Sequence, residues 1–406
     1  MRVTIQPGRA VGTVAAPPSK SMAHRLLICA ALSEGVSHIR GISLNEDICA
    51  TLDCLRALGA ECTLQEDTAT VKGVNIFTVR SAGKLCCRES GSTLRFLIPP
   101  ALLSSTDITF TGAESLFSRP LSVYENLSHT NGFSFEKDGC SLKVGGHLKP
   151  AIFSVPGDVS SQFISGLLFA LPLLDGDSAI LISPPLESRP YIDLTLQALR
   201  SFGICAQWVD ECTLHIPGNQ RYRATDISVE GDWSGAAFFA ALNAFGGDAQ
   251  ITGLNPDSLQ GDRICQQYLK ALQEGCPEID LSQCPDLGPI LFAVAAAKNG
   301  ARFTGIHRLR LKESDRITAM AQELSAFGVE VTVSENAVVI NAKAFHKPDR
   351  ILCGHNDHRI VMALSILLTL TGGQITDAQA VRKSFPDFFD RLADLGITLQ
   401  QEESYE

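Results

Sequence analysis

Apolar residues along the chain form six long stretches, and each is followed by a short alternating segment and then by a second helical pattern that ends in glycine. These terminal glycines are separated by 73, 71, 72, 53 and 68 residues, which indicates an internal repeat with one shortened unit. They are Gly59, Gly132, Gly203, Gly275, Gly328 and Gly396. Because glycine favours the left-handed backbone that ends a helix, we predict this conformation at all six positions.

The six apolar stretches are hydrophobic on nearly all sides and predict buried helices, whereas the helices that end in glycine are amphipathic and predict an outward position. The buried helices are expected within residues 22–35, 92–104, 161–174, 233–247, 287–300 and 358–373. Alternating pairs of segments predict β-hairpins at 61–73, 133–146, 204–218 and 329–342. Each repeat is therefore strand, helix, strand, helix and hairpin, and six repeats divide into two domains of three.

Composition and charge limit the class of protein. The 406 residues are 45% hydrophobic and 19% charged, which is typical of a globular chain, and the net charge of −10 argues against a role in coating nucleic acid. The N-terminus lacks the apolar segment of a secretory signal, and the apolar stretches are too short to span a bilayer. Thirteen cysteines without a C-x-x-C pair predict free, mostly buried thiols and a cytoplasmic location.

A polar segment precedes each buried helix. Helix capping explains serine and aspartate at such places, but it does not explain cations, which are unfavourable near a helix N-terminus unless an anion lies there. The cations in question are Lys20, Arg25, Arg95, Arg316 and Arg359. Six helix N-termini facing one cleft, together with these cations, would bind phosphorylated or carboxylated ligands.

Other candidate chemistry is limited. The chain has no phosphate loop, no G-x-G-x-x-G after a strand and no G-x-S-x-G. His355 and His358 are three residues apart, but without a further ligand motif a metal pair is not favoured. Asp286 can be explained equally well as a helix cap, and Glu313 as part of a solvated run of charges. Two carboxylates among cations are also consistent with an acid and a base acting between anionic substrates.

Eight motifs, in order, resemble the 5-enolpyruvylshikimate-3-phosphate synthase family over essentially the whole chain. They are APPSKSMAHR, SRPL, VSSQF, SRPYID, PDLGPILF, LKESDRI, HNDHRIVMALS and RKSFPDFFDRL. The resemblance implies an α/β fold of the α+β type, with two similar domains that each hold three βαβαββ units around buried parallel helices. It implies one domain from residues 1–12 and 228–406, a second from 13–227, an active site in the cleft between them, and a monomer.

The resemblance also implies the reaction, in which the enolpyruvyl group of phosphoenolpyruvate passes to the 5-hydroxyl of shikimate-3-phosphate without any metal or organic cofactor. This step belongs to the shikimate pathway, which leads to chorismate and the aromatic amino acids. Asp286 matches the proton acceptor, Glu313 matches the carboxylate that handles the proton at C3 of phosphoenolpyruvate, and Lys20 matches a residue that reaches both substrates.

The remaining matched positions divide by substrate. Those that match contacts to shikimate-3-phosphate are Lys20, Ser21, Arg25, Ser160, Ser161, Gln162, Ser188, Tyr191, Asp286 and Lys312. Those that match contacts to phosphoenolpyruvate are Lys20, Gly91, Arg119, Gln162, Arg316, Arg359 and Lys383. The chain departs from the family at residues 88–92, where Arg-Glu-Ser-Gly-Ser replaces Gly-Asn-Ala-Gly-Thr and Glu89 adds a negative charge near an anion subsite.

Three rival interpretations are weaker. The enolpyruvyl transferase that acts on UDP-N-acetylglucosamine has a loop cysteine before its matching arginine, whereas residues 114–119 contain none. An inactive relative that serves as a binding module predicts loss of a matched residue, yet all of them are present. RNA-processing relatives built on the same unit would need a basic face, which the net charge opposes.

Overall fold

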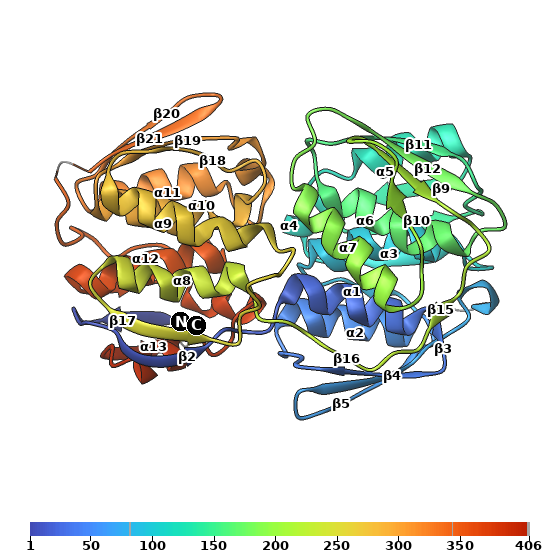
Figure 1. Cartoon of the computed structure of the whole chain (residues 1–406), viewed down its shortest axis with the longest axis horizontal. Helices are drawn as coiled ribbons and strands as arrows, with labels where there is room; N and C mark the ends of the chain where they lie inside the picture. Colours follow the sequence, from blue (N-terminus) through green and yellow to red (C-terminus); the bar gives the residue numbers. More distant parts are fainter. Residues whose placement is uncertain (81–82, 343, 404–406) are drawn as a thin grey trace. The chain divides into compact units, whose positions relative to one another are not determined.

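The computed structural model describes residues 1–80, 83–342 and 344–403 and divides the chain into two compact units. Unit 1 comprises Met1–Pro17 and Gly231–Glu406, and unit 2 comprises Pro18–Glu230 (Figure 1). Unit 2 is therefore an insertion between two segments that fold together as unit 1.

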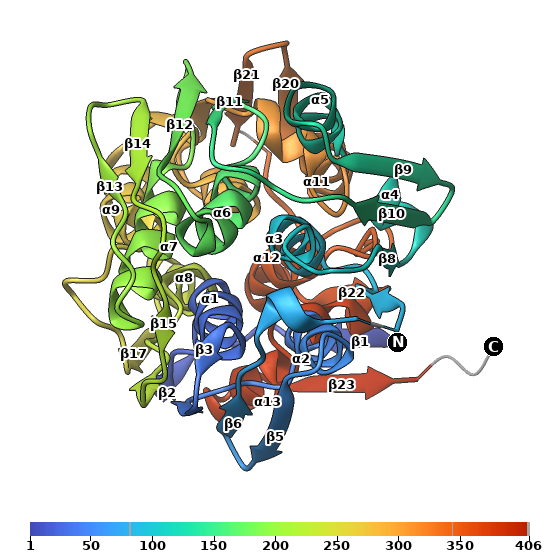
Figure 2. The same ribbon diagram turned by 90° about the vertical axis from the view of Figure 1, so that its right-hand side faces the viewer.

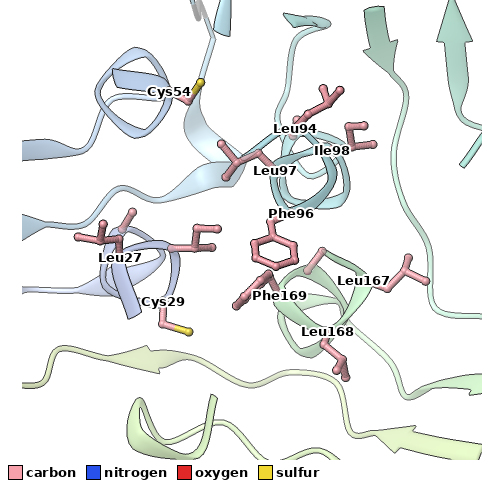
Figure 3. Close-up of a cluster of buried hydrophobic side chains, with 14 of the residues drawn as sticks. Leu27, Cys29, Cys54, Leu94, Phe96, Leu97, Ile98, Leu167, Leu168 and Phe169 are labelled. Carbon is pink, nitrogen blue, oxygen red and sulfur yellow. The ribbon is translucent and has the colours of Figure 1, made fainter. Parts of the chain in front are cut away.

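Unit 2 has three buried helices, each of which is covered by a more exposed partner. The buried ones are α1 (Lys20–Ala31), α3 (Gly91–Ala101) and α6 (Ser161–Ala170). The others are α2 (Glu46–Ala57), α4 (Glu114–Phe117), α5 (Ser122–Asn131) and α7 (Arg189–Ser201), with short 3₁₀ turns η1 (Ile76–Thr78) and η2 (Leu171–Leu173). Between α3 and α6 the rings of Phe96 and Phe169 pack edge to face with 5.5 Å between their centroids (Figure 3).

Three four-stranded sheets of one pattern surround these helices: two parallel strands followed by an antiparallel hairpin. The first is β16 (Ile227–Ser228), β4 (Val36–Arg40), β6 (Thr68–Lys72) and β5 (Glu61–Gln65). The second is β7 (Leu85–Cys86), β8 (Ile108–Thr111), β10 (Ser141–Gly145) and β9 (Ser134–Asp138). The third is β11 (Ile152–Pro156), β12 (Ser178–Ser183), β14 (Thr213–Ile216) and β13 (Gln207–Trp208), and β15 (Tyr222–Arg223) pairs separately with β3 (Ser33–Glu34). Figure 2 shows the three hairpins on the outside of the unit, around α1, α3 and α6.

Unit 1 repeats this plan with less regular sheets. Its buried helices are α8 (Trp233–Ala244), α10 (Gly288–Ala297) and α12 (His358–Thr371). The outer helices are α9 (Cys265–Glu274), α11 (Arg316–Ser325) and α13 (Phe388–Asp394), and the 3₁₀ turns are η3 (Gly261–Ile264), η4 (Pro285–Leu287), η5 (His307–Leu311) and η6 (Ala378–Lys383). One sheet keeps the four-stranded pattern, with β18 (Glu278–Asp280), β19 (Ala301–Thr304), β21 (Ala337–Asn341) and β20 (Glu330–Val333).

The other two sheets of unit 1 bring the start of the chain into this unit. Strand β1 (Arg2–Ile5) lies between β22 (Gly373–Ile375) and β23 (Leu399–Glu402), antiparallel to both. Strand β2 (Val11–Ala15) runs parallel to β17 (Asp248–Thr252). Within the described ranges, no helix combines the length and the apolar character needed to cross a membrane.

The predicted repeat is confirmed by this arrangement: all six buried helices, all six outer helices and all four hairpins are present. The left-handed glycine is confirmed at five positions but was wrong at Gly275, whose φ of −179° is extended backbone, because the shortened repeat continues directly toward β18 without a hairpin. In the sixth repeat the strand before α12 is reduced to a single bridge at Leu352.

The cysteines follow the prediction only in part. All thirteen are free, as expected. The expectation that they are mostly buried was wrong, because six are buried and four, Cys86, Cys140, Cys205 and Cys276, are exposed.

Candidate functional site

The first cluster of candidate residues, in unit 2, begins where α1 starts. Ser19 caps the helix by accepting a hydrogen bond from the backbone N–H of Met22, which leaves Lys20 as the first helical residue. The Lys20 ammonium lies 2.7 Å from Oδ2 of Asp47, in the first turn of α2. Sequence reasoning did not single out Asp47, because an acidic residue behind an Asn45 cap is an ordinary helix start.

Arg25 connects α1 to the start of α7. Its Nε donates to Oγ1 of Thr195 at 2.8 Å, its Nη2 donates to the carbonyl of Tyr191 at 2.9 Å, and its Nη1 donates to the carbonyl of Ser21. Ser188, the residue before α7, is buried and has a φ of 55°. Burial lowers the pKa of Arg25 to about 10, so the guanidinium is still protonated at neutral pH while it is held by neutral groups.

Two arginines and an amide meet at the start of α3, around Gly91. A Cβ added there would lie 3.2 Å from Nη1 of Arg119, 3.5 Å from Nη1 of Arg95 and 3.8 Å from Oε1 of Gln162. Gln162 accepts a hydrogen bond from Arg95 at 2.8 Å and donates one to Oγ of Ser92 at 2.9 Å. The absence of a side chain at Gly91 thus keeps open a space lined by two guanidinium groups and an amide oxygen.

The remaining unit 2 candidates lie at the start of α6. Ser160 is its cap and accepts a hydrogen bond from the backbone N–H of Gln162, and Ser161 is the first helical residue. The Thr93 hydroxyl in α3 lies 3.4 Å from the carbonyl of Asp47, which links the starts of α2 and α3. The N-terminal ends of these helices are therefore connected by side-chain contacts, as the predicted anion site requires.

The second cluster, in unit 1, is built around Asp286, which lies in η4 just before α10. Its Oδ1 lies 2.9 Å from Nη1 of Arg316 and 3.1 Å from Nζ of Lys312, and its Oδ2 lies 3.1 Å from Nη2 of Arg359. Neither η4 nor α10 has a side-chain cap, so capping does not explain this aspartate. Burial alone would raise the pKa of Asp286, but Arg359, Lys312 and Arg316 hold that pKa well below its usual range.

Arg316 joins three carboxylates although it is only 1% exposed. Besides Asp286, its Nη2 lies 2.7 Å from Oε2 of Glu313 and its Nε lies 2.9 Å from Oδ2 of Asp357. Burial would lower the pKa of Arg316, but Asp357, Glu313 and Asp286 raise it above its usual value. Glu313 is thus an ion-paired side chain and not part of a solvated run.

Asp357 is a buried member of this cluster that sequence reasoning missed. The side chain caps α12 by accepting from the backbone N–H of Arg359 at 2.9 Å, and it also accepts from the Ser314 hydroxyl. Its position directly before an apolar helix was the available signal, but the capping role concealed the ion pair with Arg316.

The other unit 1 candidates have separate anchors. Arg359 donates to Oγ of Ser234 at 2.7 Å, and Lys383 donates to the carbonyl of Asn356 at 2.8 Å. Burial lowers the pKa of Lys312 to about 8, although the neighbouring Asp286 acts in the opposite direction. The charge of Lys312 is therefore lost at a lower pH than that of a solvent-exposed lysine.

The histidines weighed for metal binding have other roles here. Nε2 of His355 lies 2.9 Å from Oε1 of Glu323 on α11, and His358 is the first residue of α12. Across the ranges that the structure describes, no group of three or more His, Cys, Asp or Glu side chains is arranged to hold a metal ion.

Solved structures that match nearly the whole chain include enolpyruvyl transferases. Two structures of EPSP synthase from Acinetobacter baumannii match with TM-scores of 0.79 and 0.81 at 24% and 23% identity, covering 98–99% of this chain and all of theirs. The enolpyruvyl transferase NikO from Streptomyces tendae matches with a TM-score of 0.80 at 16% identity over 98% of each chain. The fold is therefore that of the enolpyruvyl transferases, as the repeat predicts.

Sequence comparison identifies the family within that class. The family model for EPSP synthase (3-phosphoshikimate 1-carboxyvinyltransferase) matches residues 5–392. Proteins named 3-phosphoshikimate 1-carboxyvinyltransferase from Clostridium kluyveri and Clostridium perfringens are 41% and 38% identical, over 97% of both chains for the first and 99% and 100% for the second. The chain belongs to the EPSP synthase family, and the resemblance found in the sequence is confirmed.

Proposed function

We propose that this protein transfers the enolpyruvyl group of phosphoenolpyruvate to the 5-hydroxyl of shikimate-3-phosphate and releases phosphate. The reaction would supply the precursor of chorismate and of the aromatic amino acids. Family membership supports the reaction class, and the chemistry of the two clusters supports the charge of the substrates. The observation that carries the proposal is the partly buried carboxylate of Asp286 in contact with three cations.

We assign the unit 2 cluster to binding. Shikimate-3-phosphate would contact Lys20, Ser21, Arg25, Ser160, Ser161, Gln162, Ser188 and Tyr191, and phosphoenolpyruvate would contact Lys20, Gly91, Arg119 and Gln162. Arginine suits phosphate and carboxylate because its planar group donates two parallel hydrogen bonds. Arg25 fits a role in anion binding because it donates hydrogen bonds to neutral acceptors. Its positive charge is therefore available to an anion.

We assign the unit 1 cluster to phosphoenolpyruvate and to proton transfer. Arg316, Arg359 and Lys383 would bind the anionic groups of phosphoenolpyruvate, while Lys312 and Asp286 contact shikimate-3-phosphate. Glu313 would deliver a proton to C3 of phosphoenolpyruvate, and Asp286 would accept the proton of the 5-hydroxyl. Both carboxylates pair with Arg316, but Asp286 also pairs with Lys312 and Arg359, and two carboxylates in different electrostatic surroundings are suited to opposite roles as acid and base.

The low pKa of Asp286 is compatible with a role as the base when the substrate anions pair with the cations that contact Asp286 in the free protein. With Lys312, Arg316 and Arg359 paired to it, Asp286 is a weak base. An anion that binds these cations weakens their hold on Asp286 and raises its proton affinity. The base would therefore become stronger only when the reactants are in place.

The chemical steps follow from these assignments. Protonation at C3 makes C2 electrophilic, and the 5-oxygen adds to C2 as its proton passes to Asp286. The resulting tetrahedral intermediate returns a proton from C3 to Glu313 and expels phosphate from C2, which re-forms the C2–C3 double bond and gives the enol ether of the product. The cations offset the repulsion between the two anionic reactants, and their fixed placement supplies part of the rate acceleration.

Phosphate release by the purified protein tests the proposal. We expect release with shikimate-3-phosphate and phosphoenolpyruvate together, without added metal, and none with either compound alone. Release that instead requires UDP-N-acetylglucosamine as acceptor would replace the proposed substrate, and no release with either acceptor would contradict the proposed activity.

We also propose that the protein acts as a monomer in the cytoplasm, with these two small molecules as its reaction partners. Size-exclusion chromatography with light scattering at assay concentration tests the first point. A mass near 43.6 kDa is expected, whereas about twice that mass would contradict it.

A further inference from the structure

The loop that precedes α12 has a backbone that needs external support. His355 and Asn356, two consecutive residues with side chains, both have a φ of 50°. This left-handed region is disfavoured for L-residues other than glycine, so contacts elsewhere must hold it. Just before them, a Cβ on Gly354 would lie only 2.5 Å from Cγ2 of Val361 and 2.7 Å from the carbonyl of Thr376, which shows how closely the loop is packed.

Helix α11 holds this loop at both ends. Arg316, its first residue, binds Asp357, and Glu323, seven residues later and so on the same face, binds the other end. Oε1 of Glu323 lies 2.9 Å from Nε2 of His355, and its Oε2 accepts from the backbone N–H of Cys353 at 3.1 Å.

The carboxylate of Glu323 is fully buried and also accepts from Nη1 of Arg350 at 2.8 Å. A buried carboxylate without these donors would be strongly unfavourable, so each contact is part of what keeps the loop in place.

The loop in turn holds a cation assigned above to phosphoenolpyruvate. The carbonyl that accepts from Nζ of Lys383 is that of Asn356, one of the two left-handed residues. Rotation of the backbone at His355 or Asn356 would turn this carbonyl and release the ammonium. The path therefore runs from Glu323 through His355 and the Asn356 carbonyl to Lys383.

We infer that His355 and Glu323 are positioning residues for phosphoenolpyruvate: they keep the loop in its left-handed conformation, so that the carbonyl of Asn356 places the ammonium of Lys383. Neither side chain contacts substrate in this assignment. The inference rests on the proposed function, because it takes Lys383 as a phosphoenolpyruvate ligand.

Steady-state kinetics of His355→Ala test the inference. We expect the KM for phosphoenolpyruvate to rise about tenfold, the scale of losses when a supporting contact of a ligand residue is removed. The KM for shikimate-3-phosphate is expected to stay within about twofold, a split that general loss of folding would not produce. His355→Gln retains an N–H donor at the same reach and should restore most of the affinity for phosphoenolpyruvate.

A matched control is available in unit 2. Nδ1 of His38 lies 2.8 Å from Oδ1 of Asp226, but both side chains are about half exposed and neither supports a left-handed loop. His38→Ala should leave both KM values unchanged. Should His355→Ala fail to fold, His355→Leu makes the same test, because leucine fills the space of the imidazole but offers no N–H to Glu323 and does not favour the left-handed region.

A double substitution tests whether His355 affects the binding of phosphoenolpyruvate through Lys383 or independently of it. In a Lys383→Met protein, adding His355→Ala should change the KM for phosphoenolpyruvate by less than about twofold, since the residue that is positioned has gone. Multiplication of the two separate effects would overturn the inference, as would an unchanged KM in His355→Ala alone. If the unaltered protein releases no phosphate with both substrates, it is the proposed function that fails.

Discussion

The two clusters differ in what holds their cations. In unit 2, Arg25 is held by a hydroxyl and by backbone carbonyls, which are neutral. In unit 1, Arg316 lies between the carboxylates of Asp286, Glu313 and Asp357. A cation on neutral supports attracts an anion without losing a partner, whereas one paired with carboxylates must exchange partners. The neutral supports of unit 2 therefore suit anion binding. In unit 1, an anion that pairs with the cations weakens their hold on a nearby carboxylate and so raises the proton affinity of that carboxylate.

The largest effect expected from this difference is on stability. Arg316→Met leaves the buried carboxylate of Asp357 and two partly buried carboxylates without their shared cation, which costs about 3–5 kcal/mol. Arg25→Met removes hydrogen bonds to neutral groups and costs about 1–3 kcal/mol. Urea unfolding measures both, because Trp233 reports on unit 1 and Trp208 on unit 2. Equal losses of unfolding free energy in the two variants would contradict the expected difference between carboxylate partners and neutral partners.

The next effect concerns catalysis. Asp286→Asn should lower kcat at least about a hundredfold, the scale of general-base catalysis, with smaller changes in both KM values. Asp387→Asn in the same unit removes a partly exposed ion pair with Arg391 and should leave kcat unchanged. A near-normal kcat in Asp286→Asn would show that the carboxylate surrounded by cations is not the base.

A smaller effect is expected at Lys20, a candidate cation of unit 2 that is paired with a carboxylate, as Arg316 is in unit 1. Lys20 is paired with Asp47, and Lys20→Met should raise the KM for both substrates about tenfold, since each loses a charged hydrogen bond. Lys72→Met, which breaks the exposed ion pair with Glu61, is the control. A change in only one KM would contradict a position between the two substrates.

The smallest effect is a dependence on pH that belongs to unit 1. Lys312 has a pKa of about 8 in the free protein, so it loses its charge as pH rises and binds an anion less well. From pH 7 to 8.5, kcat/KM for shikimate-3-phosphate should fall by about fourfold through this group. Lys312→Arg keeps the charge throughout this range and should abolish the fall.

Local pattern was enough to predict the helices and hairpins, because each apolar stretch and each alternating pair carries its own periodicity. Gly275 shows where this fails: the backbone conformation at the end of a helix depends on the next element of the fold, and after Gly275 the hairpin is missing. Asp357 shows a second limit, since one side chain both caps a helix and pairs with a distant arginine. The sequence motif indicates the local capping role of Asp357 but does not indicate its ion pair with Arg316.

Several candidate residues, among them Lys20, Arg316 and Asp286, came from their place before the predicted helices, and motif resemblance supplied the rest. The structure adds their partners: Asp286 contacts Arg359, 73 residues away, and Gln162 contacts Arg95, 67 residues away, separations close to one repeat length. Such contacts arise because equivalent helices of successive repeats begin near one another. The repeat length therefore predicted which segments would meet, but not which atoms.

The position of β1 has a consequence for synthesis of the chain. Val3 pairs with Gln401 of β23 and with Ile375 of β22, so the first strand is made long before either partner. At about 5–20 residues per second, roughly 20 to 75 seconds pass before the first partner is translated. Unit 2 can complete its fold on the ribosome during that interval, and β2 can pair with β17 soon afterwards, whereas β1 remains without its partner strands until translation is nearly finished.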